Sequence, residues 1–119
     1  AGATVATYAA GVDLAVRATE GLDVEVVDLR TVWPFDRETI LESLGKTSRL
    51  LVLQEASRSS GVAGQILSLA ARDGFELLDA PPALVAPPDT PVPFAPALEG
   101  AYQPSVESVR RAVEELLEY

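Results

Sequence analysis

Short apolar runs typical of β-strands alternate along this chain with stretches whose apolar residues recur at helical spacing. The apolar runs predict strands at residues 3–7, 22–29, 49–54, 75–78 and 83–86. The helical spacing predicts helices at residues 8–19, 36–44, 60–72 and 105–117. Residues 50–53 are all apolar, as in a strand buried on both faces, which favours a parallel sheet covered by helices. Strands that alternate with helices predict an α/β sandwich with right-handed crossovers.

The segment DLRTVWPFDRETI, residues 28–40, contains the strongest local signals in the chain. Pro34 lacks a backbone N–H, so we expect it to end strand pairing. Asp36 is the predicted N-cap of the next helix, because its carboxylate can accept hydrogen bonds from the free amides of the first turn. Phe35 and Ile40 have the spacing of a hydrophobic staple around that cap. The segment therefore predicts a strand end, a proline turn and a capped helix.

Glycines are predicted to mark helix ends and close backbone contacts. Gly21 and Gly45 each follow a helical pattern and are expected to end it. Gly61 and Gly64 lie near the start of the third predicted helix, where the missing side chain would let backbone approach backbone closely. Ser105 is placed to cap the last helix.

Seven of the nine prolines lie between Pro81 and Pro96. A disordered linker is one interpretation of that density. Apolar residues such as Phe94 and Leu98 are interleaved with the prolines, and this favours an ordered, stiff loop on the surface.

The chain of 119 residues is predicted to form one domain, residues 1–119, with a core mostly of Ala, Val and Leu, because only 6% of its residues are aromatic. The net charge of −9 disfavours nucleic acid and anionic membranes as partners and suits a basic protein. No apolar run approaches the roughly 20 residues that span a bilayer. The chain begins with Ala1 and contains no Met, which indicates a fragment of a longer polypeptide.

Side chains for catalysis are scarce. There is no His and no Cys, and neither a P-loop nor a dinucleotide fingerprint occurs. Asp28, Glu55 and Asp89 each follow or lie near a predicted strand end, so a metal site at one sheet edge is conceivable. Simpler roles are favoured: Asp28 pairs with Arg30 or a backbone amide, Glu55 caps a loop, and Asp89 is a turn residue. The G-V-A-G string at 61–64 opens a helix, and helix packing is favoured over anion binding.

Four segments, taken in order, resemble the C-terminal domain of the transketolase superfamily, and most strongly that of the beta subunit of the thiamine-dependent component of 2-oxo acid dehydrogenases. The segments are residues 28–40, LLVLQEA at 50–56, SGVAGQI at 60–66, and PPDTPVPFAPALEGAYQPSVE at 87–107. Two departures occur: Gln54 stands where many relatives have a histidine, and Ser60-Gly61-Val62 replaces a Gly-Gly-Phe-like turn.

The resemblance implies a three-layer α/β/α sandwich around a five-stranded, mostly parallel mixed sheet. It implies that thiamine diphosphate and its Mg²⁺ are held by other domains of the parent enzyme, because the G-D-G signature is not in this chain. It also implies no catalytic, cofactor-binding or metal-binding residue here. The expected partners are the parent's other domains and subunits and the dihydrolipoyl acyltransferase. The expected compartment is the bacterial cytoplasm or the mitochondrial matrix.

Three hypotheses follow. The first is a non-catalytic assembly and docking domain of a dehydrogenase beta subunit, which the P-D-T-P-V-P-F loop favours. The second is the same domain in a transketolase or a deoxyxylulose-phosphate synthase. The third is a stand-alone α/β small-molecule binding module, which the missing pocket signature disfavours. The predicted interface or structural residues are Asp28, Arg30, Pro34, Asp36, Glu55, Gly61, Asp89, Pro91, Pro93, Phe94, Tyr102 and Pro104.

Overall fold

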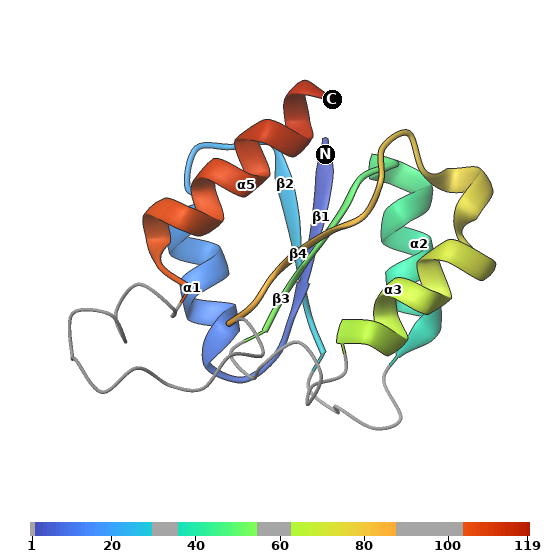
Figure 1. Ribbon diagram of the computed structural model, residues 1–119, viewed down its shortest axis with the longest axis horizontal. Helices are drawn as coiled ribbons and strands as arrows, with labels where there is room; N and C mark the ends of the chain where they lie inside the picture. The colour runs from blue at the N-terminus through green and yellow to red at the C-terminus, as the bar shows by residue number, and fades with distance from the viewer. Residues whose placement is uncertain (1, 30–35, 55–62, 88–103) are drawn as a thin grey trace.

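The computed structural model describes residues 2–29, 36–54, 63–87 and 104–119 (Figure 1). Strands and helices alternate along these ranges, as the apolar pattern predicts. The elements are β1 (Ala3–Thr7), α1 (Ala10–Ala18), β2 (Val24–Asp28), α2 (Arg37–Thr47), β3 (Leu50–Leu53), α3 (Ala63–Arg72), the 3₁₀ turn η1 (Phe75–Leu77), β4 (Ala83–Val85) and α5 (Val106–Glu118).

The described strands form one sheet in the order β2-β1-β3-β4, and every pairing within it is parallel. Val5 lies opposite Val26 on one side and Leu51 on the other. The two central strands, β1 and β3, are buried along their whole length, as the apolar run 50–53 predicts.

The described part of the sheet has four strands rather than the five expected, and it contains no antiparallel pair. One predicted strand, residues 75–78, is wrong: Phe75–Leu77 form a 3₁₀ turn. The amide of Gly74 donates to the carbonyls of Leu69 and Ala70, and the amide of Leu77 donates to the carbonyl of Gly74. These local bonds continue the end of α3 as a tight turn, and Phe75 is left 70% exposed.

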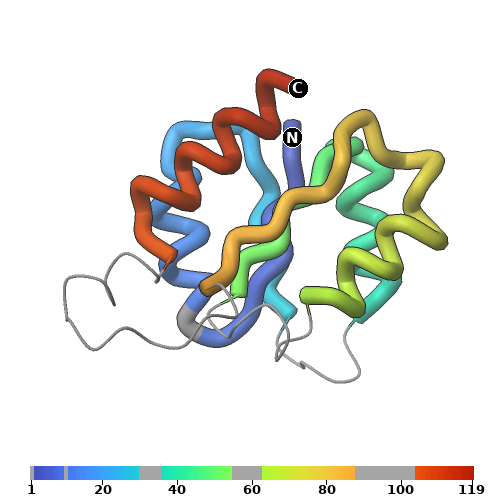
Figure 2. Tube along the Cα trace, viewed as in Figure 1, coloured from blue at the N-terminus to red at the C-terminus, as the bar shows by residue number. Residues whose placement is uncertain are grey.

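Helices cover both faces of the sheet, so the predicted three-layer sandwich is confirmed. Figure 1 shows α1 and α5 on one face and α2 and α3 on the other. Alternate residues of β1 enter the two cores: Ala3 and Val5 pack with α1 and α5, and Ala6 packs with α2 and α3. The start of β1 and the end of α5 lie side by side (Figure 2), and a Cβ added to Gly2 would lie 2.9 Å from Leu117 Cδ2.

The glycine predictions have mixed outcomes. Gly21 has a φ of 82° in the turn after α1, in agreement with its predicted role near that helix end. Gly45 does not end α2, which continues to Thr47 and ends where Ser48 has a φ of 62°. Gly64 is exposed, and among the described residues no atom beyond its chain neighbours and its own helix backbone lies within 4 Å of the position that its Cβ would take, so the described residues show no close approach there.

Helix α2 continues past Gly45 because its last turn is fixed by buried hydroxyl groups. Thr4 Oγ1 of β1 lies 2.6 Å from Ser43 Oγ and 2.7 Å from Thr47 Oγ1. Thr47 Oγ1 also donates to the carbonyl of Arg49 at 3.2 Å. All three hydroxyl-bearing residues are buried, so each group needs such partners to offset the loss of water.

Candidate functional site at the carboxyl edge of the sheet

We call the end of the sheet where Thr7, Asp28, Leu53 and Val85 terminate their strands the carboxyl edge, at the lower side of Figure 1. The connection after β1 leads to α1 on one face, and the connection after the neighbouring strand β3 leads to α3 on the opposite face. Such a topological switch point is where open parallel α/β sheets place their binding sites.

At the end of β1, helix α1 lies unusually close to the strand. A Cβ added to Gly11 would lie 2.1 Å from Thr7 Oγ1 and 3.8 Å from Leu53 Cγ. The Thr7 hydroxyl is buried and has no hydrogen-bond partner among the residues that the structure describes. Ala9, between strand and helix, has a φ of 54° and a ψ of −132°, and it provides no side-chain cap. Close packing therefore fixes this helix start, and the G-V string at 11–12 gave no sign of it in the sequence.

At the end of β3, a buried amide side chain fixes the start of α3. Gln54 is 1% exposed, and its Oε1 accepts a hydrogen bond of 3.0 Å from the amide of Ala63. The backbone amide of Gln54 donates to the carbonyl of Val85 at 3.0 Å. Gln54 thus joins the ends of β3 and β4 to the first turn of α3. We predicted no role for it, although a polar residue directly after four buried apolar ones was a usable signal.

The predicted cap at Asp36 is confirmed. Asp36 Oδ1 accepts from the amide of Thr39 at 3.1 Å, and Asp36 Oδ2 accepts from the Thr39 hydroxyl at 2.6 Å. These hydrogen bonds, first the one from the Thr39 hydroxyl, hold the pKa of the Asp36 carboxyl below its usual range. The next residue, Arg37, forms an ion pair with Asp73 after α3, so the two helices of this face are also joined by charge.

Two other predicted residues are described. Asp28 is exposed at the end of β2. Pro104 is partly buried directly before Ser105, and Ser105 forms a reciprocal capping box with Ser108. Outside the described residues lie Arg30, Pro34, Phe35, Glu55, Gly61, Asp89, Pro91, Pro93, Phe94 and Tyr102. The predicted pairing of Asp28 with Arg30 and the convergence of Asp28, Glu55 and Asp89 stay predictions.

The described residues do not fit a metal or a thiamine cofactor. Within the ranges that the structure describes, no three His, Cys, Asp or Glu side chains are grouped as metal ligands. The whole sequence also contains no G-D-G string to hold a diphosphate with its metal.

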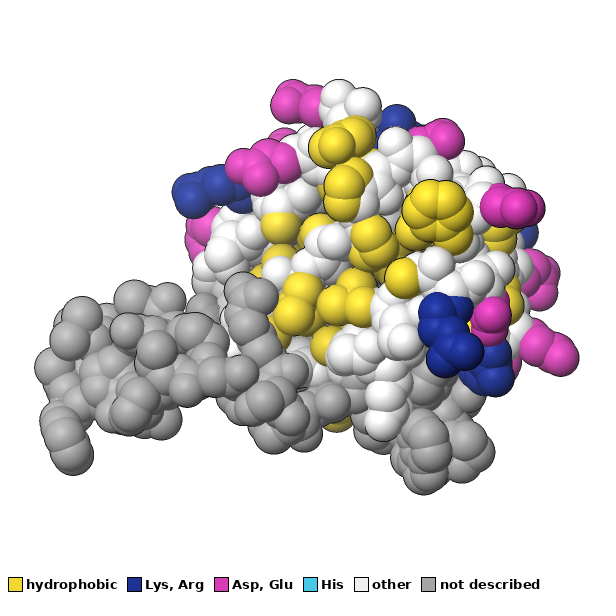
Figure 3. All heavy atoms as spheres, turned by 45° about the vertical axis from the view of Figure 1, so that its right-hand side comes forward, with side chains coloured by type: hydrophobic (Ala, Val, Ile, Leu, Met, Phe, Trp, Pro, Cys, Tyr) yellow, Lys and Arg dark blue, Asp and Glu magenta, His cyan; other side chains and the backbone are white. Residues whose placement is uncertain are grey.

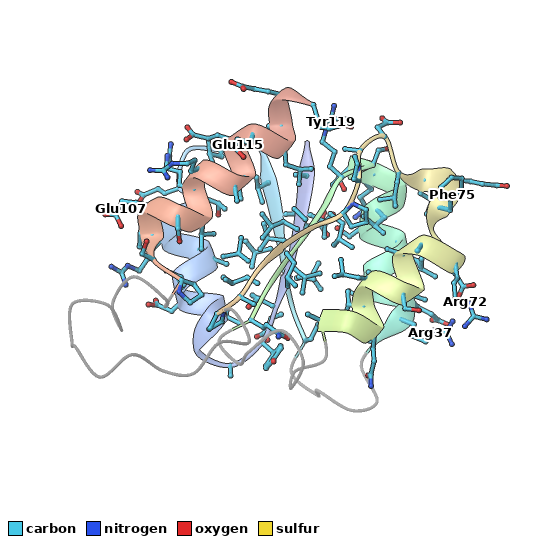
Figure 4. The ribbon with its side chains drawn as sticks, in the orientation of Figure 1. Arg37, Arg72, Phe75, Glu107, Glu115 and Tyr119 are labelled. Atoms are coloured by element: carbon cyan, nitrogen blue, oxygen red, sulfur yellow. The ribbon has the colours of Figure 1, made fainter. Side chains whose placement is uncertain are left out.

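The surface is acidic, with a few exposed apolar residues. Figure 4 shows Glu107 and Glu115 on α5 pointing away from the sheet. Phe75 and Tyr119 are 70% and 71% exposed. In Figure 3, apolar side chains gather in the middle of one face and charged side chains lie around them. In the described part of the chain, no helix has the length and apolar character needed to cross a bilayer.

The parallel sheet with helices on both faces and a switch point between its central strands defines a doubly wound α/β domain. The sequence profile of the family described as "Transketolase, C-terminal domain" matches residues 2–109. The chain belongs to this transketolase C-terminal domain family.

Several curated proteins are similar to this chain. The acetoin:2,6-dichlorophenolindophenol oxidoreductase subunit beta of Cupriavidus necator is 45% identical over 98 residues, which cover 82% of this chain and 29% of that protein. The pyruvate dehydrogenase E1 component subunit beta of Rickettsia felis is 39% identical over an alignment that covers 98% of this chain and 37% of that protein. The 2-oxoisovalerate dehydrogenase subunit beta of Pseudomonas aeruginosa is 40% identical over an alignment that covers 97% of this chain and 33% of that protein. The chain therefore spans about a third of the length of these relatives.

A solved structure described as "Split gene transketolase, inactive beta4 tetramer" superposes with a TM-score of 0.78. The superposed region includes 98% of this chain and 38% of the transketolase chain, and the two sequences are 24% identical. This likeness confirms the fold class predicted from the sequence.

Proposed function

We propose that this chain is the C-terminal assembly and partner-docking domain of the beta subunit of a thiamine-dependent 2-oxo acid dehydrogenase. The observation that carries the proposal is the similarity of nearly the whole chain to about a third of three beta subunits that act in such enzymes or in an acetoin enzyme. In this proposal the parent performs an oxidative decarboxylation, and this domain contributes contacts rather than chemistry.

The cofactor of the parent is thiamine diphosphate with Mg²⁺, held by its other domains. The missing G-D-G string and the absence of His from the sequence support a role without cofactor contacts for this domain. The role of the domain is then to bring the cofactor-binding parts of the enzyme into their working arrangement. The parent works in the bacterial cytoplasm or the mitochondrial matrix.

The partners are the parent's other domains and subunits, together with a basic protein for which the dihydrolipoyl acyltransferase is the candidate. Charge supports a basic partner: α5 exposes four glutamates, and the whole chain has a net charge of −9. The exposed glutamates of α5 are Glu107, Glu114, Glu115 and Glu118.

The competing hypotheses have less support. A transketolase or a deoxyxylulose-phosphate synthase would need only its own second copy as partner, but the similar beta subunits belong to dehydrogenases and an acetoin enzyme. A stand-alone binding module would resemble relatives of its own length, and this chain spans about a third of the relatives named here.

The test uses the full-length subunit that carries this chain, expressed together with its cognate alpha subunit. Sedimentation should show a complex, and thiamine-dependent turnover should be seen with pyruvate or a branched-chain 2-oxo acid. Deleting residues 1–119 should abolish assembly, and the isolated 119 residues should show no turnover. Full activity of the deleted enzyme would overturn the proposal, and turnover of acetoin alone would move the substrate from 2-oxo acids to acetoin.

A further inference from the structure

Gln54 connects three elements through two different groups. Its backbone amide donates to Val85 at the end of β4, and its side-chain oxygen accepts from Ala63 at the start of α3. Gln54 is 1% exposed and Ala63 is fully buried, so water cannot replace either group. The first amides of a helix have no partner within the helix, and a buried amide without a partner is costly. The hydrogen bond between the Gln54 side-chain oxygen and the Ala63 amide therefore gives each buried group a partner.

This arrangement differs from the starts of the other described helices. Asp36 and Ser105 cap α2 and α5 from the residue directly before the helix. Helix α1 has no side-chain cap and is fixed by the contact of Gly11 with Thr7. Among the described helices, only α3 has its first turn bonded to a side chain at a strand end, nine residues earlier. This hydrogen bond therefore fixes the position of the first turn of α3 relative to the sheet.

The position of this bond gives it consequences beyond α3. Gln54 follows β3 at the switch point of the sheet, where open α/β sheets place their binding surfaces. Of the four segments that carry the family resemblance, two contain the end of a strand at this edge, those of β2 and β3, and a third begins two residues after the end of β4. A shift of α3 or of the end of β4 relative to β3 would change the shape of this edge.

We propose that Gln54 is a positioning residue for assembly: its hydrogen bonds to Ala63 and Val85 set the shape of the carboxyl edge that the domain presents to the rest of the parent enzyme. The inference rests on the proposed assembly function. Gln54 contacts no substrate or cofactor in this role and acts through the helix and the strand that it holds.

The test compares Gln54→Met with Gln54→Glu in the full-length beta subunit. Met keeps the length of the side chain and removes the acceptor oxygen, whereas Glu keeps an acceptor oxygen in either protonation state. Thr47→Val is the matched control, because Thr47 is also buried and hydrogen-bonded but lies at the opposite end of the sheet, beside the start of β3. The measurements are the dissociation constant for the alpha subunit, the melting temperature, and hydrogen exchange at Ala63.

Gln54→Met should speed exchange at Ala63 and weaken assembly by about tenfold, within the usual range of coupling between sites. Gln54→Glu should weaken assembly less than Gln54→Met, because the carboxyl group keeps an acceptor oxygen for Ala63. Thr47→Val should leave assembly unchanged even where it lowers the melting temperature as much. Wild-type assembly by Gln54→Met, or equal weakening by Thr47→Val, would overturn the positioning role. Failure of the wild-type subunit to assemble at all would instead overturn the proposed function on which this role rests.

Discussion

The contact between Gly11 and Thr7 predicts that the effect of Gly11→Ala on stability changes sign when Thr7 is also replaced by alanine. A Cβ at Gly11 would lie 2.1 Å from Thr7 Oγ1, far inside van der Waals contact. Thr7 is fully buried and β-branched, so its χ1 is restricted by the surrounding core and the hydroxyl has little room to move away. Gly11→Ala alone should therefore destabilise the domain, although alanine is the better helix former.

The magnitude follows from two opposing terms. Overpacking a well-packed core costs roughly 1–3 kcal/mol. In the interior of a helix, replacing glycine by alanine gains about 0.8–1.0 kcal/mol, which is an upper limit for Gly11 as the second residue of α1. Gly11→Ala should thus cost up to about 2 kcal/mol in the wild-type background. In a Thr7→Ala background the obstructing oxygen is gone, and the same change should become stabilising by up to about 1 kcal/mol.

The assay is urea unfolding of the wild type, both single variants and the double variant, which forms a double-mutant cycle. A coupling energy of about 1–3 kcal/mol is expected for residues in such contact. Thr7→Ala also removes a buried hydroxyl that has no partner in the described part of the chain, so its own cost should be that of the lost methyl group and cavity. If Gly11→Ala costs the same in both backgrounds, the close approach of α1 to β1 is not the reason for glycine at this position.

Four further predictions concern the Asp36 cap, the cofactor and the proline-rich segment. Asp36→Ala should lower the melting temperature by a few degrees, and by more than Asp89→Ala, because Asp36 caps α2; equal melting temperatures would count against that cap. Hydrogen bonds from Thr39 hold the pKa of the folded Asp36 carboxyl below its usual range, so its charge contributes stability above the unfolded pKa, and this stability is lost as the pH falls through the folded pKa. Asp36→Asn should reduce this loss in acid titrations of unfolding while keeping the cap. Titration calorimetry of the isolated chain with thiamine diphosphate and Mg²⁺ should be flat, and a micromolar site would contradict the proposed role without cofactor contacts. Limited proteolysis should spare residues 81–96, and rapid cutting there with a stable remainder would support the linker hypothesis.

Features determined by neighbouring residues could be predicted from the sequence. The Asp36 cap depends on contacts within three residues, and the strand 50–53 is defined by its continuous apolar run. Both predictions are confirmed. The short apolar run at 75–78 was predicted as a strand, but a run of this length also fits a turn. The hydrogen bonds from the amide of Gly74 to Leu69 and Ala70 continue the end of α3 and make the run a turn.

Features determined by distant residues could not be predicted. Glycine is common at helix ends, which led to the prediction that α2 ends at Gly45. The hydrogen bonds that join Thr4 of β1 to Ser43 and Thr47 instead stabilise the part of α2 beyond Gly45. The requirement for glycine at position 11 depends on where α1 crosses the end of β1. The role of Gln54 depends on the meeting of three elements that the sequence separates by as much as 31 positions, from Gln54 to Val85.

The two helices that leave the switch point are held in different ways, and this difference bears on assembly. The start of α1 is held by packing against Thr7 and Leu53, which is insensitive to charge and direction. The start of α3 is held by a buried hydrogen bond from Gln54, which has a defined length and direction. In the proposed assembly role the domain has to present a reproducible surface, and a directional bond to the sheet meets that need better than packing alone. Weakening the Gln54 bond should therefore disturb assembly more than an equally destabilising change in the core between β1 and α2.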